Sequence, residues 1–193
     1  MKNIKYLFKN MDLSKLRDVC LHYKDAAPEY YIDPIPEKKI NNARESLNIP
    51  FDVEIFALID LTVFGSAKNA LTVTVNGLYW KSIDDWHPVF LSWEKLRECY
   101  ISEKPGMLSK LIYIGSDLQI DLSGAGSLNK KYNKIVMSLL SDLKALSEGN
   151  LTEEVLSENS DQSSNGLVEC EFCSGMIKPE VTYCKHCGIK LRG

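Results

Sequence analysis

Apolar side chains recur every three or four residues in two stretches near the N-terminus, as in the buried face of a helix. The first stretch follows Asp12, a good N-cap, and predicts a helix over residues 12–24. The second follows Pro36 and predicts a helix over residues 37–47, which ends before Pro50. The apolar positions are Leu13, Leu16, Cys20 and Tyr23 in the first stretch and Ile40, Ala43 and Leu47 in the second.

From Phe51 the period of the apolar positions changes to two, which is typical of β-strands. Asn76-Gly77 lies between two alternating runs and predicts a β-hairpin. Pro, Gly and polar clusters separate the other runs, so we expect about seven antiparallel strands joined as a meander. They are expected over residues 53–59, 71–75, 78–82, 88–93, 98–102, 110–114 and 118–122, with a short crossing at 94–97.

A strongly amphipathic helix is predicted after the last strand, with Ser127 as its cap. Seven antiparallel strands followed by one helix, with the N-terminal helices before them, predict an α+β domain. The order is similar to that of the pleckstrin-homology-like fold, and this resemblance implies an antiparallel β-barrel or sandwich that is capped by the C-terminal helix and preceded by N-terminal helices. The last helix is then expected to plug an open corner of the bent sheet. The apolar positions of the last helix are Leu128, Tyr132, Ile135, Val136, Leu139, Leu140, Leu143 and Leu146.

This order of elements resembles the pleckstrin-homology-like (PH-like) fold, and one stretch looks like a bacterial family with such a domain. The stretch reads ALIDLTVFGSAKNALTVTVNGLYWK over residues 57–81, with Ala70 where the relatives usually have glycine. The resemblance covers about residues 51–147. It implies a non-enzymatic binding scaffold and names no particular ligand.

Four segments are expected along the chain. Residues 1–50 form an N-terminal helical segment and residues 51–147 the PH-like domain. Residues 148–168 form an acidic linker, rich in Ser, Asn, Asp and Gln, which cannot bury enough apolar surface to fold. Residues 169–193 form a small zinc ribbon. The N-terminal segment has a basic face. This face either contacts an anionic membrane surface or a partner or, as we favour, is simply solvated while the helix packs on the main domain.

Two C-x-x-C pairs near the C-terminus predict a zinc site, because four thiolates satisfy a tetrahedral Zn²⁺. Gly175 and Gly188 follow the pairs and suit the sharp turns of zinc knuckles. Four thiolates close the coordination shell, so the zinc is expected to be structural. The ligands are Cys170, Cys173, Cys184 and Cys187.

The segment around these cysteines resembles the short zinc ribbons appended to many bacterial proteins, whose second half reads like YCKHCGIKL. Strands over 168–171 and 176–178 are expected to pair, and so small a core requires the metal in order to fold. Disulfides or a redox C-x-x-C are disfavoured, since the chain has no secretory signal and neither pair lies in a βαβ context.

Composition restricts the function. The chain has 193 residues, 45% of them hydrophobic and 25% charged, with a net charge of −3. These values are typical of a globular cytoplasmic protein and argue against a dedicated nucleic-acid binder, which needs a basic patch. No apolar run approaches the length of a transmembrane helix. Cys20 and Cys99 are expected to be reduced thiols of the core.

Two further functions are disfavoured by the residues. A phosphoinositide clamp needs basic side chains in an early loop, and residues 65–69 offer only Lys68. An enzyme needs a catalytic constellation, but the three histidines have no G-x-S-x-G partner, and Gly124-Ala125-Gly126 completes no phosphate-binding motif. The histidines are His22, His87 and His186.

The sequence therefore favours a cytoplasmic adaptor that binds another protein through the barrel and its exposed turns, with the structural zinc ribbon as a further candidate contact. Of the three tryptophans, Trp86 is expected to be exposed because its neighbours are polar, while Trp80 and Trp93 pack in the core. The alternative is a nucleic-acid-binding or regulatory protein that acts through the ribbon, whose charge makes a poor electrostatic match for a phosphate backbone.

Overall fold

The structure is a computed structural model that describes residues 11–103, 111–125, 130–150, 168–169 and 176–177. The chain divides into two units, Met1–Leu151 and Thr152–Gly193. Four helices and two antiparallel sheets lie in the described part of the first unit, which makes it an α+β fold. None of the helices in the described ranges is long and apolar enough to span a bilayer.

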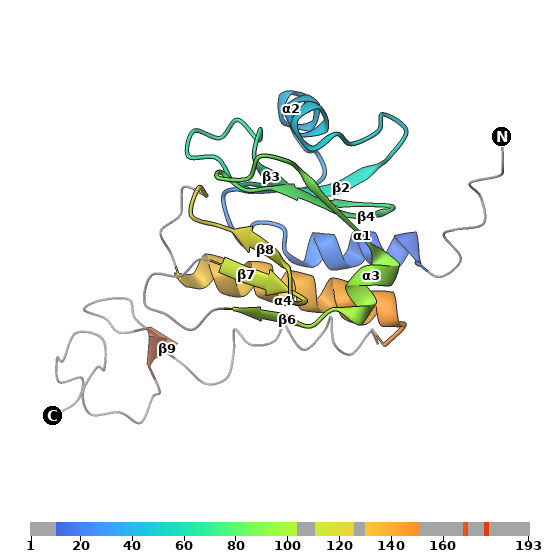
Figure 1. The fold of residues 1–193 in the computed structure, drawn as a ribbon. Helices are drawn as coiled ribbons and strands as arrows, with labels where there is room; N and C mark the ends of the chain where they lie inside the picture. The colour runs from blue at the N-terminus through green and yellow to red at the C-terminus, as the bar shows by residue number, and fades with distance from the viewer. Residues whose placement is uncertain (1–10, 104–110, 126–129, 151–167, 170–175, 178–193) are drawn as a thin grey trace, which may run out of the picture. The chain divides into compact units, whose positions relative to one another are not determined.

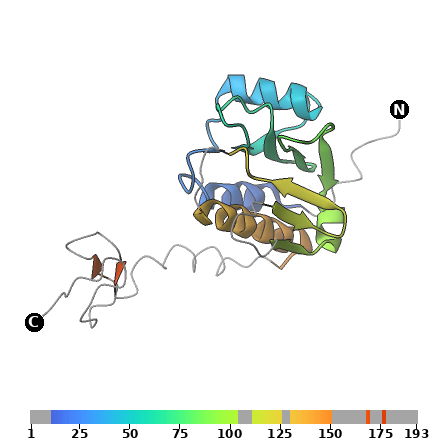
Figure 2. The ribbon, with the colours of Figure 1, turned by 60° about the vertical axis from the view of Figure 1, so that its left-hand side comes forward.

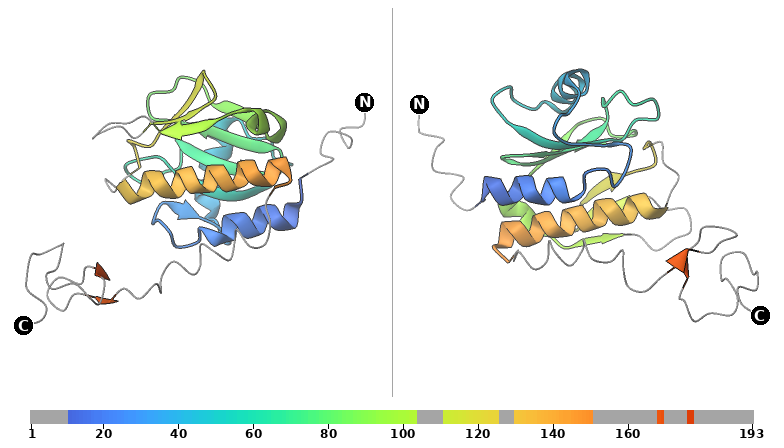
Figure 3. Two further views of the ribbon diagram at one scale, coloured as in Figure 1. Left: turned by 90° about the horizontal axis from the view of Figure 1, so that it is seen from below. Right: turned by 180° about the vertical axis from the view of Figure 1, so that it is seen from behind.

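Helix α1 (Leu13–His22) confirms the first predicted helix. The Asp12 side chain caps it by accepting hydrogen bonds from two backbone N–H groups of the first turn, at 3.0 and 3.3 Å. Helix α1 packs alongside α4 (Lys130–Glu148), as Figure 3 shows from below. The Tyr23 hydroxyl at the end of α1 donates to Asp142 of α4 at 2.6 Å, which fixes the two helices to each other.

Helix α2 (Glu37–Leu47) has the predicted bounds, with Pro36 at its N-cap. It ends where Asn48 adopts a left-handed conformation with φ of 54°. Ala43 and Leu47 are buried and pack in a core cluster with Leu58 and Tyr79 of the sheet below. Helix α2 therefore covers one face of that sheet (Figures 1 and 2).

The larger sheet has five antiparallel strands in sequential order, β1-β2-β3-β4-β5. Strand β1 was not predicted, because it is only two residues long and lies in a proline-rich stretch. Helix α2 covers one face of the sheet, and α1 and α4 lie on the other side (Figures 1 and 3). Because helices cover both faces, almost every residue of β2, β3 and β4 is buried. The alternating apolar positions in the sequence predict burial on one face only. The strands are β1 (Tyr30–Tyr31), β2 (Ile55–Asp60), β3 (Ala70–Thr74), β4 (Gly77–Lys81) and β5 (Val89–Ser92).

The β3–β4 hairpin is confirmed, but its turn lies one residue earlier than predicted. Thr74 pairs with Gly77, so the turn consists of Val75 and Asn76 and Gly77 is the first residue of β4. Gly77 has a φ of 145°, and a Cβ there would lie 2.1 Å from the backbone oxygen of Leu91. The glycine is thus required by the close approach of β5 rather than by the turn.

The smaller sheet has the order β6-β7-β8, with β6 (Ile101–Glu103), β7 (Leu111–Ile114) and β8 (Leu118–Asp121). The short crossing expected before it is helix α3 (Trp93–Glu98), which the Ser92 hydroxyl caps. Helix α4 follows β8 and contacts α3 and β6. The expected cap Ser127 lies outside the described residues.

The sequence predicts a β-barrel or a sandwich. In the described part of the first unit the strands form no closed barrel and pair as two separate sheets. Side chains link the sheets instead. The Trp80 indole N–H of β4 donates to the backbone oxygen of Gln119 in β8 at 2.9 Å. The Asp121 backbone N–H donates to the Ser82 hydroxyl at 3.0 Å. Apolar side chains along α4 are fully buried, namely Val136, Leu139, Leu140 and Leu143.

In the second unit, β9 (Val168–Glu169) pairs antiparallel with β10 (Met176–Ile177). This confirms the strand pair that the sequence predicts around the first C-x-x-C.

Candidate functional site

The three tryptophans lie as predicted. Trp80 and Trp93 are buried, and the Trp93 indole N–H donates to the backbone oxygen of Val75 at 3.0 Å. Trp86 lies in the loop after β4 with 91% of its surface exposed. A large aromatic side chain that remains in water on a folded domain is a candidate anchor for a partner.

A second exposed aromatic side chain, Phe64, was missed by the sequence reasoning. It lies in the loop between β2 and β3 and is 97% exposed, and Val63 beside it is 58% exposed. Ile83, near Trp86, is 46% exposed. The polar and small residues of 65–69 that follow Phe64 are the signal that could have placed it on a loop tip. We refer to Val63, Phe64, Ile83 and Trp86 as the loop face.

The loop face lies at one end of the larger sheet. Asp60 pairs with Ala70, and Ala70 pairs with Lys81. The loops that follow β2 and β4 therefore begin at the same end of the strands. Gly124 lies between the two loops. A Cβ on it would lie 2.2 Å from the backbone oxygen of Leu61 and 3.7 Å from the Cβ of Ile83.

The loop that carries Val63 and Phe64 is organised around the Asp60 carboxylate, which is 1% exposed. One carboxylate oxygen accepts hydrogen bonds from the Lys39 ammonium at 2.7 Å and the Ala67 backbone N–H at 3.0 Å. The other accepts from the Thr62 backbone N–H at 2.9 Å and from its hydroxyl. A buried carboxylate with this many donors is fully satisfied and holds the loop on both sides of Phe64.

Helix α2 holds the same loop through two side chains. Lys39 donates to the backbone oxygen of Gly65 at 2.6 Å, and Asn42 donates to that of Ser66 at 2.7 Å. Ala67 has a φ of 57°, a conformation that alanine adopts only where its surroundings impose it. The loop is therefore held in one shape while its two apolar side chains face water.

The Lys39 ammonium also lies over an aromatic ring. It lies 4.4 Å from the centre of the Tyr31 ring. Burial lowers the pKa of Lys39, but the hydrogen bond and charge of Asp60 outweigh this effect and raise it, so the ammonium stays charged.

The loop that carries Ile83 and Trp86 is tied to the sheets by hydrogen bonds. Asp85 accepts from the Ser82 backbone N–H at 2.7 Å. The Ser82 hydroxyl in turn accepts from the backbone N–H of Asp121 in β8. Both loops of the loop face are thus anchored at their bases.

Charges near the loop face have both signs. Lys68 and Asp84 are exposed in the two loops, and Lys81 is half-buried at the end of β4. The Lys39 charge is neutralised by Asp60. Nucleic acid and anionic headgroups require a concentrated positive field, so this surface suits a protein partner better.

The predicted zinc ligands Cys170, Cys173, Cys184 and Cys187 lie outside the described residues. The first pair lies in the segment that joins the antiparallel strands β9 and β10. Elsewhere, the described residues contain no group of three or more His, Cys, Asp or Glu side chains able to hold a metal ion.

The other two cysteines were expected in the core, and they form no disulfide within the described residues. Cys20 is buried in α1, and burial raises the pKa of its thiol to about 12. Cys99 is half-buried after α3.

No family model matches this chain, and no significant match was found among the curated proteins or the solved structures.

Proposed function

We propose that the chain is a non-enzymatic cytoplasmic adaptor, in which a PH-like domain binds another protein through the loop face and a structural zinc ribbon follows. The observation that carries this proposal is the exposure of Phe64 and Trp86 on two loops with fixed bases. Exposed apolar side chains on a mobile loop would lose entropy on binding. Side chains on a preorganised loop avoid much of that loss.

The PH-like assignment is supported by the order of the elements. Four consecutive antiparallel strands (β2–β5) are followed by three more (β6–β8) in a second sheet, and α4 comes last. Such a domain is a scaffold that presents loops, and its ligand is decided by the loops rather than by the fold. The zinc ribbon is proposed from the two C-x-x-C pairs, with Zn²⁺ held by four thiolates.

The proposal is tested by affinity purification of the tagged full chain from extracts of its own host. The double variant Phe64→Ala/Trp86→Ala removes both aromatic anchors. Phe51→Ala is the matched control, since Phe51 is 91% exposed at the opposite end of β2. Truncating an anchor of a protein interface costs about 2 kcal/mol or more, so the double variant should lose its partner.

Each outcome of the purification has a distinct meaning. A nuclease-resistant partner that binds the wild-type chain and Phe51→Ala, but not the double variant, supports the proposal. Partners that disappear on nuclease treatment favour the nucleic-acid alternative. A partner that is lost from a chain ending at Leu151, but kept by the double variant, assigns the contact to the second unit and contradicts the loop face.

A further inference from the structure

An exposed phenylalanine lies beside a cleft at the C-terminal end of α2. The cleft has a volume of about 350 Å³ and is lined by Phe51, by Ile49 and by three side chains of α2, namely Asn41, Arg44 and Glu45. Phe51 is 91% exposed, whereas Ile49 is buried. We refer to these five residues as the Phe51 cleft. An aromatic ring in water next to a partly apolar recess is a candidate interaction surface.

The turn that carries Phe51 is held in one shape. The backbone oxygen of Pro50 accepts hydrogen bonds from the Val53 backbone N–H at 3.1 Å and from the Arg44 guanidinium at 2.6 Å. Arg44 also donates to the backbone oxygen of Val53 at 2.8 Å. Because these bonds fix the turn on both sides of Phe51, little backbone entropy is lost when its ring becomes buried in an interface.

Two opposite charges line the Phe51 cleft. Arg44 and Glu45 are neighbours on α2, and neither forms an ion pair with another described residue. The two backbone oxygens that are bonded to Arg44 orient its guanidinium but carry no net charge. A basic group and an acidic group of the same surface are therefore both available to a partner.

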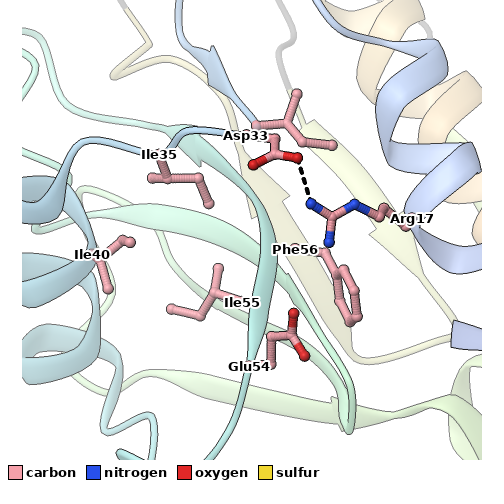
Figure 4. A pocket seen from close by; sticks show the side chains of 8 residues that line it. Arg17, Asp33, Ile35, Ile40, Glu54, Ile55 and Phe56 are labelled. Atoms are coloured by element: carbon pink, nitrogen blue, oxygen red, sulfur yellow. Dashed lines mark hydrogen bonds and ion pairs between the residues drawn. The ribbon is translucent and has the colours of Figure 1, made fainter. Parts of the chain in front are cut away.

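A smaller cavity, of about 150 Å³, lies beside the start of β2, and its charges act on one another (Figure 4). Arg17 of α1 forms an ion pair with Asp33 there. Asp33 raises the pKa of the Arg17 guanidinium, and the charge of Glu54, which lines the same cavity, adds to this effect. The charges of this smaller cavity thus interact within the chain, unlike those of the Phe51 cleft.

We propose that the Phe51 cleft binds the same cleft on a second copy of this chain, which makes the protein a two-fold symmetric dimer. The Phe51 ring of each copy enters the cleft of the other, and Glu45 of each copy faces Arg44 of the other. A cavity of about 150 Å³ already holds a benzene molecule, so a cleft of about 350 Å³ has room for the ring.

A second copy fits this surface because the surface is complementary to itself. In a two-fold interface one patch meets its own copy, so each projection needs a recess and each charge needs its opposite within that patch. The Phe51 cleft contains both pairs, the ring with the recess and Arg44 with Glu45. A partner surface with charges of one sign would oppose a like charge at one of the two positions.

The test is the oligomeric state of the full chain, measured by sedimentation equilibrium over a range of protein concentrations. The wild-type chain should form a dimer that dissociates on dilution. Phe51→Ala should raise the dissociation constant of the dimer at least about thirtyfold, the effect of truncating one interface anchor. Tyr100→Ala removes another exposed aromatic side chain, is the matched control and should leave the constant unchanged.

The charge pair is tested by a second variant. Glu45→Arg places like charges opposite each other at both symmetric positions, so it should raise the dissociation constant about tenfold. Glu98→Arg, at an exposed position at the end of α3, changes the net charge by the same amount and should have no effect.

The outcomes separate clearly. A dimer that is lost in Phe51→Ala and weakened in Glu45→Arg, with both controls unchanged, supports the proposal. It is overturned by a wild-type chain that stays monomeric at about 1 mM, where even a weak specific dimer forms. It is equally overturned by a dimer that Phe51→Ala leaves intact, or by losses of the same size in the controls.

The dimer and the loop face are tested independently, because the Phe51 cleft precedes β2 and the loop face follows it. The double variant Phe64→Ala/Trp86→Ala should dimerise as the wild type does. A monomeric Phe51→Ala chain keeps a complete loop face, so it should still bind the partner of that face. Failure of one proposal therefore leaves the other standing.

Discussion

At the scale of single residues, the buried carboxylate of Asp60 holds the loop that carries Phe64 of the loop face. Asp60 is a charged residue in the core, and it accepts hydrogen bonds from Lys39, Thr62 and Ala67. Its role could not be predicted from the sequence. Thr62 and Ala67 lie in the loop that follows Asp60, but only the fold brings Lys39 of α2 to the same carboxylate. The apolar periodicity places Asp60 merely at the end of a strand.

Replacing Asp60 with asparagine should destabilise the first unit by about 3 kcal/mol. The amide has one acceptor where the carboxylate has two, so the Lys39 ammonium or a backbone N–H is left buried without its partner. The free energy of unfolding in urea measures this loss. Asp84→Asn, at an exposed position in the neighbouring loop, is the control and should change stability by less than about 0.5 kcal/mol. An Asp60→Asn chain as stable as the wild type would contradict the role of this network.

At the scale of elements, the capping residues and prolines in the sequence predicted where the first two helices begin and end. Asp12 and Pro36 start α1 and α2, and the bounds of α2 agree with the structure because a proline at one end and Asn48 at the other limit the helix. Strand β1 was missed because two residues carry no periodicity. It exists only through its pairing with Ile59 and Leu58 of β2.

Gly77 offers a test of why the β3–β4 hairpin has its register. Gly77→Ala should cost about 3 kcal/mol, because its φ is positive and its Cβ would collide with the backbone oxygen of Leu91. Gly149→Ala is the matched control, since φ there is 77° but no atom lies within 4 Å of the added Cβ. The control should cost about 1 kcal/mol. Equal losses in thermal or urea unfolding would mean that conformation alone, and not the approach of β5, requires Gly77.

At the scale of the whole molecule, the division into Met1–Leu151 and Thr152–Gly193 predicts two independent responses to metal removal. Cys184→Ser, or a zinc chelator, should unfold the second unit, because too few apolar residues remain there to fold without metal. The melting temperature of the first unit should stay unchanged in calorimetry. Bound zinc, measured by elemental analysis, should be one per chain in the wild type and absent from the variant. A first unit that melts earlier in Cys184→Ser would show that the two units are coupled.

The sequence by itself determined the α+β class, most of the helices and strands, the exposure of Trp86 and the burial of Trp80 and Trp93. These properties follow from apolar periodicity, capping residues and polar neighbours, all of which act over a few positions. The zinc ligands remain a prediction from the sequence alone, since spacing defines a C-x-x-C pair before any fold is known.

Only the tertiary structure decided that the strands form two sheets, that helices lie on both sides of the larger one, and that Phe64 lies on a preorganised loop. These features depend on contacts between residues far apart in the chain. Such contacts form only when burial of the whole core outweighs the entropy of ordering the segments between them.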